Sequence, residues 1–138
     1  MVRIRPGESG DLAAVAAIQA ASPEASHWPV EDYLGYDFLV AVEEDCVAGF
    51  LVSRLSAPDE REILNLAVDP SVRRTGVATA LVRALRQTGS GSTFLEVRES
   101  NRAAIELYQR LGFQHFGIRL GYYINPPEAA VVMKFQSC

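Results

Sequence analysis

The stretch Arg73-Arg74-Thr75-Gly76-Val77-Ala78 lies between an apolar run, Ile63 to Val68, and a segment with helical periodicity. The apolar run is typical of a buried strand, and glycine is typical of a turn. Beyond the turn, apolar residues recur at the i, i+4, i+7 and i+8 positions of a helix with one apolar face: Val77, Leu81, Ala84 and Leu85. The stretch therefore predicts a strand, a cationic glycine turn and the start of a helix.

This turn has the properties of an anion site. The first N–H groups of a helix lack intrahelical partners and carry the positive end of its dipole. Arg73 and Arg74 add two guanidinium groups, and Gly76 lets the backbone approach a ligand closely. The spacing is neither that of a Walker loop nor that of the dinucleotide fingerprint. A nucleotide-like anion is the expected ligand, although a solvated arginine pair beside an ordinary turn is an equal alternative on these residues alone.

Composition limits the class of protein. The chain has 138 residues, of which 49% are hydrophobic and 22% charged, as expected for one globular domain spanning residues 1–138. Its net charge of −4 argues against general nucleic-acid binding. No run approaches the ~20 apolar residues of a membrane span, and Met1 to Pro6 is too polar for a signal peptide. We therefore expect a cytoplasmic protein without membrane contact.

The metal-ligating residue types are sparse. Cys46, expected between two strands, and Cys138 have no spacing that suggests a disulfide or a metal site, and His27 and His115 have no paired partner pattern. No metal is therefore expected.

The remaining pattern is a mixed α/β order. A first helix is capped by Ser9 or Asp11 and interrupted at Ser22-Pro23, and a second begins at Ser100 or Asn101 and ends at Gly112. The predicted strands are Phe38 to Val42 and Val47 to Arg54 around the turn Glu43-Glu44-Asp45, then Glu62 to Val68, Thr93 to Arg98, Phe116 to Tyr122 and Ala130 to Phe135.

At this point the chain resembles a family from about Arg3 to Phe135. The blocks Leu64-Asn65-Leu66-Ala67-Val68-Asp69-Pro70, Arg73-x-x-Gly76-x-Ala78 and Leu111-Gly112-Phe113 are similar to successive motifs of the GNAT superfamily of N-acetyltransferases. Within it, the chain is most similar to the bacterial ribosomal-protein-alanine N-acetyltransferases. That similarity rests on Leu95-Glu96-Val97-Arg98, Asn101, Ala103-Ala104-Ile105, Tyr108 and Arg119-Leu120-Gly121-Tyr122-Tyr123.

The resemblance implies an α/β (α+β) GNAT fold, with a mixed, mostly antiparallel sheet of six to seven strands, splayed central strands and about four flanking helices. It implies acetyl-CoA as co-substrate. The backbone of Leu66, Ala67 and Val68 would pair with the pantetheine arm as an added strand does. Residues Arg74, Thr75, Gly76, Val77, Ala78 and Thr79 would hold the diphosphate, with Arg73 beside them, and Asn101 would touch the cofactor, cap its helix, or both.

Acetyl transfer by direct attack on the thioester needs a proton acceptor for the amine and a proton donor for the thiolate. By resemblance these are Glu96, acting directly or through a water, and Tyr108. Two alternatives remain open, because Glu96 would also suit a solvent-facing strand position and Tyr108 an apolar helix face. Glu62, with Glu60 near the start of the central strand, is a competing base.

The acceptor can be weighed by proton affinity. An α-amine titrates at about 8 and lysine at about 10.4, so neutralising lysine costs roughly 3 kcal/mol more at pH 7. One carboxylate base therefore favours an N-terminal α-amine, and the resemblance points to a protein such as a ribosomal protein. The same analogy builds the acceptor groove from the His27-Trp28-Pro29 loop and the Tyr122 to Pro127 loop, for a peptide with a small first residue.

Other classes of function remain open. A small-molecule amine acetyltransferase would share the same fold, and so would an acyl-CoA-binding module without turnover. A monomer and a homodimer are both compatible with the sequence.

Overall fold

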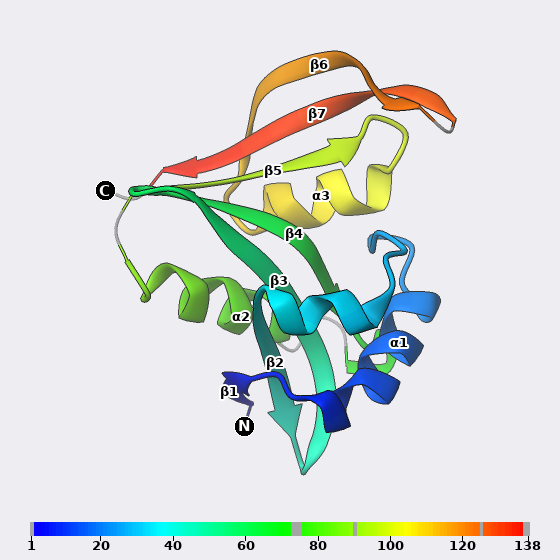
Figure 1. Cartoon of the computed structure of the whole chain (residues 1–138), viewed down its shortest axis with the longest axis vertical. Helices are drawn as coiled ribbons and strands as arrows, with labels where there is room; N and C mark the ends of the chain where they lie inside the picture. The colour runs from blue at the N-terminus through cyan, green and yellow to red at the C-terminus, as the bar shows by residue number, and fades with distance from the viewer. Residues whose placement is uncertain (1, 73–75, 90, 125, 137–138) are drawn as a thin grey trace.

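The computed structural model describes residues 2–72, 76–89, 91–124 and 126–136. Its strands are β1 (Arg3–Pro6), β2 (Asp37–Glu43), β3 (Cys46–Ala57), β4 (Glu60–Val68), β5 (Ser92–Arg98), β6 (Gln114–Ile124) and β7 (Pro127–Gln136). The helices are α1 (Leu12–Ala21), α2 (Val77–Arg86) and α3 (Arg102–Arg110), with short 3-10 segments η1 (Ser9–Asp11), η2 (Val30–Gly35) and η3 (Pro70–Val72). Figure 1 shows their arrangement.

The strands form one sheet in the order β1-β2-β3-β4-β5-β7-β6. Neighbouring strands are antiparallel except β4 and β5, which run parallel. The parallel step follows from the intervening helix α2, because parallel neighbours need a crossover connection. The mixed, mostly antiparallel sheet predicted from the sequence is confirmed.

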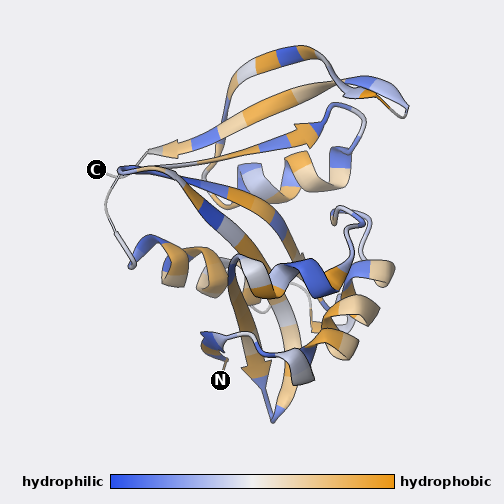
Figure 2. Ribbon diagram, viewed as in Figure 1, coloured by the Kyte–Doolittle hydropathy of each residue, from blue (hydrophilic) through white to orange (hydrophobic). Residues whose placement is uncertain are grey.

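Helices cover both faces of the sheet. On β3, Leu51 belongs to one buried cluster, which contains the apolar faces of α2 and α3, while Phe50 and Val52 belong to a second cluster with α1 and Tyr33 of η2. Successive residues of a strand point to opposite faces, so α2 and α3 lie on one side of the sheet and α1 and η2 on the other. Figure 2 shows α1 as hydrophobic over most of its length, whereas α2 carries hydrophobic and hydrophilic residues side by side.

Most predicted elements are present, with longer strands than expected. The hairpin around Glu44 and Asp45 is confirmed, and both residues have positive φ angles of 51° and 63°. Gly112 follows α3 with φ of 100°, as expected for a residue that ends a helix. The structure corrects two predictions. Cys46 is the first residue of β3 rather than lying between strands. The predicted Tyr122 to Pro127 loop is mostly strand, because β6 runs to Ile124 and β7 begins at Pro127.

Four elements were not predicted: β1 and the 3-10 segments η1, η2 and η3. β1 is a short edge strand whose residues pair with β2 from Arg3↔Val42 to Pro6↔Leu39. Its polar sequence does not itself favour a strand, and pairing with β2 in the folded protein determines its conformation. Among the residues described, no helix combines the length and the apolar character that crossing a membrane requires.

Candidate functional site

The central feature of the site is a fork between β4 and β5. The two strands pair from Glu60↔Ser92 to Ile63↔Leu95, and their ladder ends there although both strands continue. Beyond the fork, the Leu64 to Val68 part of β4 keeps β3 as its neighbour on the other side. Figure 1 shows β4 and β5 diverging from this point. The splayed central strands expected from the resemblance are therefore present.

The free edge of β4 presents backbone groups to the fork. The N–H of Asp69 donates to the carbonyl of Ala48 at 2.8 Å, which directs Asp69 toward β3. Because backbone groups alternate along a strand, Ala67 also faces β3, while Leu66 and Val68 face the fork. The Leu66 N–H already donates to Oδ1 of Asn65 at 3.0 Å, and Ser22 Oγ donates to the Val68 carbonyl at 3.4 Å.

A cavity of about 590 Å³ lies between the start of α2 and the outer side of α3. Gly76 precedes α2 with φ of 86°, a left-handed conformation that glycine adopts without strain. The first-turn N–H groups of α2 lack intrahelical partners, and the residues that carry them line the cavity. The lining comprises Glu24, Val68, Gly76, Val77, Ala78, Thr79, Ala103, Glu106, Leu107, Arg110 and Leu111.

Five of the predicted cofactor residues meet at this cavity: Val68, Gly76, Val77, Ala78 and Thr79. Leu66, Ala67 and Asn101 are not among its described lining residues. Arg73, Arg74 and Thr75 lie outside the described residues. The position of a helix start beside an open strand edge fits a ligand with an anionic group and an extended arm.

Asn101 is the N-cap of α3. Its Oδ1 accepts from the N–H of Ala104 at 3.1 Å, and its Nδ2 donates to the carbonyl of Glu24 at 3.4 Å. The capping role is confirmed, and this side chain ties the start of α3 to the segment after α1. Its contact with a cofactor stays a prediction.

Glu96 and Glu62 stand at the fork, one on each arm. Glu96 directly follows Leu95 and Glu62 directly precedes Ile63, the last paired residues. Since Ile63 and Leu95 both belong to the cluster with α2 and α3, the two carboxylates lie on the opposite face of the sheet. The predicted base and its competitor are therefore both near the point where the strands separate.

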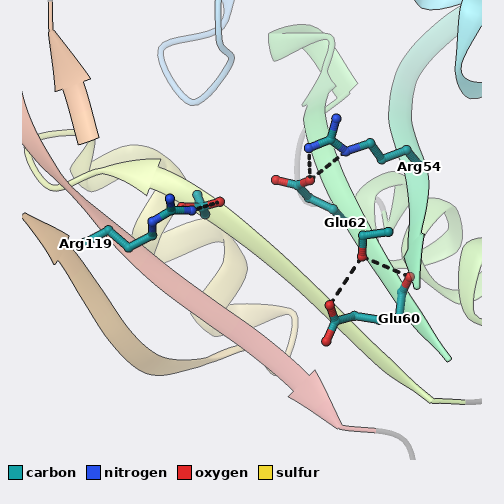
Figure 3. A network of polar contacts seen from close by, with 6 residues as sticks. Arg54, Glu60, Glu62 and Arg119 are labelled. Carbon is teal, nitrogen blue, oxygen red and sulfur yellow. Dashed lines mark hydrogen bonds and ion pairs between the residues drawn. The ribbon is translucent and has the colours of Figure 1, made fainter. Parts of the chain in front are cut away.

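Each carboxylate has an arginine partner. Nη1 of Arg119 lies 2.8 Å from Oε2 of Glu96, and Nη2 of Arg54 lies 2.7 Å from Oε1 of Glu62. Both glutamate side chains are only 9% exposed, whereas both arginines are more than half exposed. Figure 3 shows the Arg54–Glu62 pair on β3 and β4, with Arg119 reaching toward β5 and Glu60 turned toward the other end of β4. The reading of Glu96 as a solvent-facing carboxylate is wrong, because the side chain is covered.

Glu60 has a local partner instead. Its Oε1 and its carbonyl accept from the hydroxyl of Ser56, and the contact is exposed. This places Glu60 away from the fork and leaves Glu62 as the competing carboxylate on β4.

Tyr108 lies on the buried face of α3. Its ring packs edge-on against Phe113, with centroids 5.5 Å apart, and the residue is 5% exposed. Burial raises the pKa of the Tyr108 hydroxyl, and the Glu24 carboxylate adds to the shift. The packing role is confirmed, and the hydroxyl stays protonated through the physiological pH range.

A buried polar cluster around Asn65 holds the segment between α1 and η2 against β4. Nδ2 of Asn65 donates to the Ser26 carbonyl at 2.9 Å and to the Tyr33 hydroxyl at 2.9 Å, and Oδ1 accepts from the Ser26 N–H at 3.0 Å. Gln19 joins the cluster and donates to the Trp28 carbonyl at 2.8 Å. Asn65 is not among the predicted site residues, although an amide inside the apolar run Leu64 to Val68 is a signal for a buried polar contact.

On the far side of the fork, Tyr36 and Tyr122 come near Arg54 from separate elements. Hydrogen bonding to Glu62 raises the pKa of the Arg54 guanidinium, and nearby Tyr36 and Tyr122 add to the effect. Tyr36, Tyr122 and Trp28 are each about two-fifths exposed. The predicted His27-Trp28-Pro29 loop therefore supplies one exposed aromatic side chain, Tyr122 supplies another from strand β6 rather than from a loop, and Tyr36, which follows η2, adds a third.

Neither histidine is part of a cluster. Across residues 2–72, 76–89, 91–124 and 126–136, no group of three or more His, Cys, Asp or Glu side chains is placed to hold a metal ion.

Comparison with known proteins gives three results. Residues 12–113 match the model of the acetyltransferase (GNAT) family. The chain is 39% identical to a [ribosomal protein bS18]-alanine N-acetyltransferase of Haemophilus ducreyi over 98 residues, which cover 66% of this chain and 67% of that protein. The crystal structure of the ribosomal-protein-S18-alanine N-acetyltransferase from Escherichia coli superposes with a TM-score of 0.76 at 30% identity, covering 100% of this chain and 96% of that one.

A second solved structure is similar at the level of fold. Ard1 from Thermoplasma volcanium superposes with a TM-score of 0.79 at 28% identity, covering 97% of this chain and 96% of that chain.

Proposed function

Since the chain belongs to the GNAT family and is an acetyl-CoA-dependent N-acetyltransferase, we propose that its acceptor is the N-terminal α-amine of a ribosomal protein. The activity in the names of its relatives supports this acceptor. An α-amine is also the easier acceptor for a single carboxylate base, because it loses its proton at lower pH than lysine does. A ribosomal acceptor implies a cytoplasmic site of action.

The proposed binding site for acetyl-CoA is the fork between β4 and β5. The free edge of β4 would bind the pantetheine arm along the predicted segment Leu66, Ala67 and Val68, through the backbone groups of Leu66 and Val68, because those of Ala67 face β3; the Val68 N–H is the strongest candidate donor. The diphosphate would lie against Gly76 to Thr79, with Arg73, Arg74 and Thr75 completing the turn and Asn101 nearby. The left-handed Gly76 and the cavity beside it fit an anionic group at the helix start.

The reaction then needs two proton transfers. The neutral amine nitrogen attacks the thioester carbonyl carbon, a C–N bond forms, and the C–S bond breaks. Glu96 takes the proton that the nitrogen loses, directly or through a water, and the Tyr108 hydroxyl donates a hydrogen bond to the departing sulfur, which then takes a proton from solvent. The products are an N-acetyl amine and the free thiol, and solvent takes the proton from Glu96.

The protonation state of Tyr108 suits a donor but limits when it can act. Its buried hydroxyl has a raised pKa, so it holds its proton more strongly than a free thiol, which titrates at about 8.5, holds its own. Transfer to a fully formed thiolate is therefore unfavourable. We infer that Tyr108 hydrogen-bonds to the sulfur as negative charge develops on it during cleavage.

Thiol release from acetyl-CoA tests this function. The purified protein is given peptides with a free N-terminal alanine, the same peptides with a blocked N-terminus and an internal lysine, and polyamines. Release with the free-N-terminus peptides alone is expected. Release with polyamines alone would instead identify a small-molecule acetyltransferase, and acetyl-CoA binding without release for any acceptor would favour a binding module.

A further inference from the structure

The candidate base Glu96 is held by a residue two strands away. Arg119 lies on β6, and β7 separates β6 from β5. One nitrogen, Nη1 of Arg119, contacts both carboxylate oxygens of Glu96, at 2.8 Å and 3.1 Å. This contact is visible in Figure 3, where the arginine side chain extends across the intervening strand. A charge-assisted contact to both oxygens restricts the rotation of the carboxylate.

The same end of β6 also holds the backbone of Glu96. The hydroxyl of Tyr123 donates to the Glu96 carbonyl at 3.4 Å. The Arg119 guanidinium lies 4.4 Å from the ring centroid of Tyr122, and the Tyr122 and Tyr123 rings meet edge-on at 5.0 Å. The segment from Arg119 to Tyr123 therefore contacts Glu96 at two points, the carboxylate and the carbonyl.

An irregularity in β6 brings these two contacts together. Arg119 pairs with Ala130 and Tyr123 with Glu128, so four steps along β6 correspond to two along β7. A regular strand would separate Arg119 and Tyr123 by about 13 Å, roughly twice the spacing of their partners. Gly121, with φ of 65°, lies inside this bulge. Bulges of this kind redirect side chains.

We propose that Arg119 is a positioning residue for Glu96, with the β6 bulge as its support. The inference rests on the proposed function, because it takes Glu96 as the base. Glu96 is covered but Arg119 is 56% exposed, so solvent screens the pair and its contribution to fold stability should be small, about 1 kcal/mol. Holding the carboxylate in one orientation keeps its accepting oxygen within reach of the amine or of a bridging water.

The test uses steady-state kinetics and thermal unfolding of Arg119→Gln and Arg119→Lys. For Arg119→Gln we expect kcat to fall about 10- to 100-fold, with the KM for acetyl-CoA and the Tm unchanged. Arg119→Lys keeps a cationic donor and should recover part of kcat. Arg61→Gln is the matched control, since it removes an ion pair of the same length, 2.8 Å to Asp37, away from the fork. Its kcat should equal that of the wild type.

The double variant Glu96→Gln/Arg119→Gln separates positioning from other effects. If Arg119 acts only through Glu96, the double variant should be no slower than Glu96→Gln alone. A fold-loss of kcat in the double variant equal to the product of the two single losses would overturn the inference. A wild-type kcat in Arg119→Gln, measured beside an inactive Glu96→Gln, would also overturn it. Full activity of Glu96→Gln would instead overturn the assignment of Glu96 as the base. Loss of kcat in Arg54→Gln but not in Arg119→Gln would assign the base to Glu62.

Discussion

Ile63 and Leu95 form the last pair of the parallel ladder between β4 and β5. Their side chains lie in the same buried cluster, so the fork that begins beyond them is fixed by core packing. The next residue on β5 is Glu96, and the strand edge that continues on β4 faces the opening. One packed pair therefore sets both where an extended ligand can pair with β4 and where the candidate base stands.

Glu96→Gln should lower kcat by about 10² to 10⁴, because the amide cannot accept the amine proton. Acetyl-CoA affinity should stay at the wild-type value, since the cavity at α2 does not include Glu96. Rapid-mix turnover and equilibrium binding of acetyl-CoA measure the two quantities. Glu62→Gln is the comparison, because Glu62 is equally covered and equally paired. A larger loss in Glu62→Gln than in Glu96→Gln would contradict the assignment.

Gly76→Ala should weaken acetyl-CoA binding. A Cβ at Gly76 meets no atom within 4 Å, so alanine would not clash there. The positive φ of 86° would cost an L-residue about 1–2 kcal/mol in conformational energy, and the added methyl group would keep the diphosphate of acetyl-CoA farther from the helix start. We expect a higher KM for acetyl-CoA with the acceptor KM unchanged. Gly35→Ala also meets no atom within 4 Å and has no positive φ, and it serves as the control. Equal KM values for both variants would argue against an anion site at this turn.

Tyr108→Phe should separate the packing role from the chemical one. Over the part of the chain that the structure describes, the Tyr108 hydroxyl makes no hydrogen bond, so its loss should leave the Tm close to wild type. Turnover should fall on the order of 10²-fold if the hydroxyl assists the departing sulfur. Tyr108→Ala removes the ring from Phe113 and should cost about 3–5 kcal/mol of stability. Wild-type turnover in Tyr108→Phe would restrict this residue to packing.

Alkaline pH should destabilise the fold through its buried tyrosines. Burial raises the pKa of Tyr123 to about 12 and raises that of Tyr108, whereas an unfolded tyrosine titrates at about 10. Above pH 10 the unfolded chain loses phenolic protons that the folded chain keeps, so the free energy of unfolding falls as pH rises. Thermal unfolding followed by circular dichroism at pH 8 to 11.5 should show a steady Tm to about pH 9 and a decline above pH 10. The decline should be shallower in Tyr108→Phe, and an identical slope would contradict this origin.

Asn65→Leu should unfold at markedly lower temperature. The substitution leaves the Ser26 backbone groups and the Leu66 N–H without their buried partner, and each orphaned group costs about 1–3 kcal/mol. Because Ser26 belongs to the segment before Trp28, the acceptor KM should also rise in any folded fraction. Ser56→Ala, which removes an exposed contact to Glu60, is the control. A Tm equal to that of the control would show that the cluster does not hold this segment.

The strand β4 and the helix start of α2 were predictable because both leave a local pattern, whereas the fork was expected only from the family resemblance. An apolar strand, a glycine turn and a periodic helix occur in succession from Ile63 to Leu85, and the family motifs fall on the same residues. Gly112 was predictable for the same reason, since a glycine directly after an apolar helical face marks the end of a helix.

The partners of the site residues were not predictable. Arg119 contacts Glu96 across β7 because β6 contains a bulge. The spacing of residues in the sequence does not predict the register of β6 on β7. Asn65 similarly binds Ser26, 39 positions earlier in the chain, through contacts that exist only once α1 packs on the sheet. β1 was missed because its pairing with β2 depends on a strand more than 30 residues away.

The most direct test of the central claim is mass-spectrometric localisation of the acetyl group on one peptide. The peptide carries a free N-terminal alanine and an internal lysine, and it is incubated with the protein and acetyl-CoA. An N-terminal acetyltransferase should place a single acetyl group on the α-amine and none on the lysine. Acetylation of the lysine with the α-amine left free would contradict it.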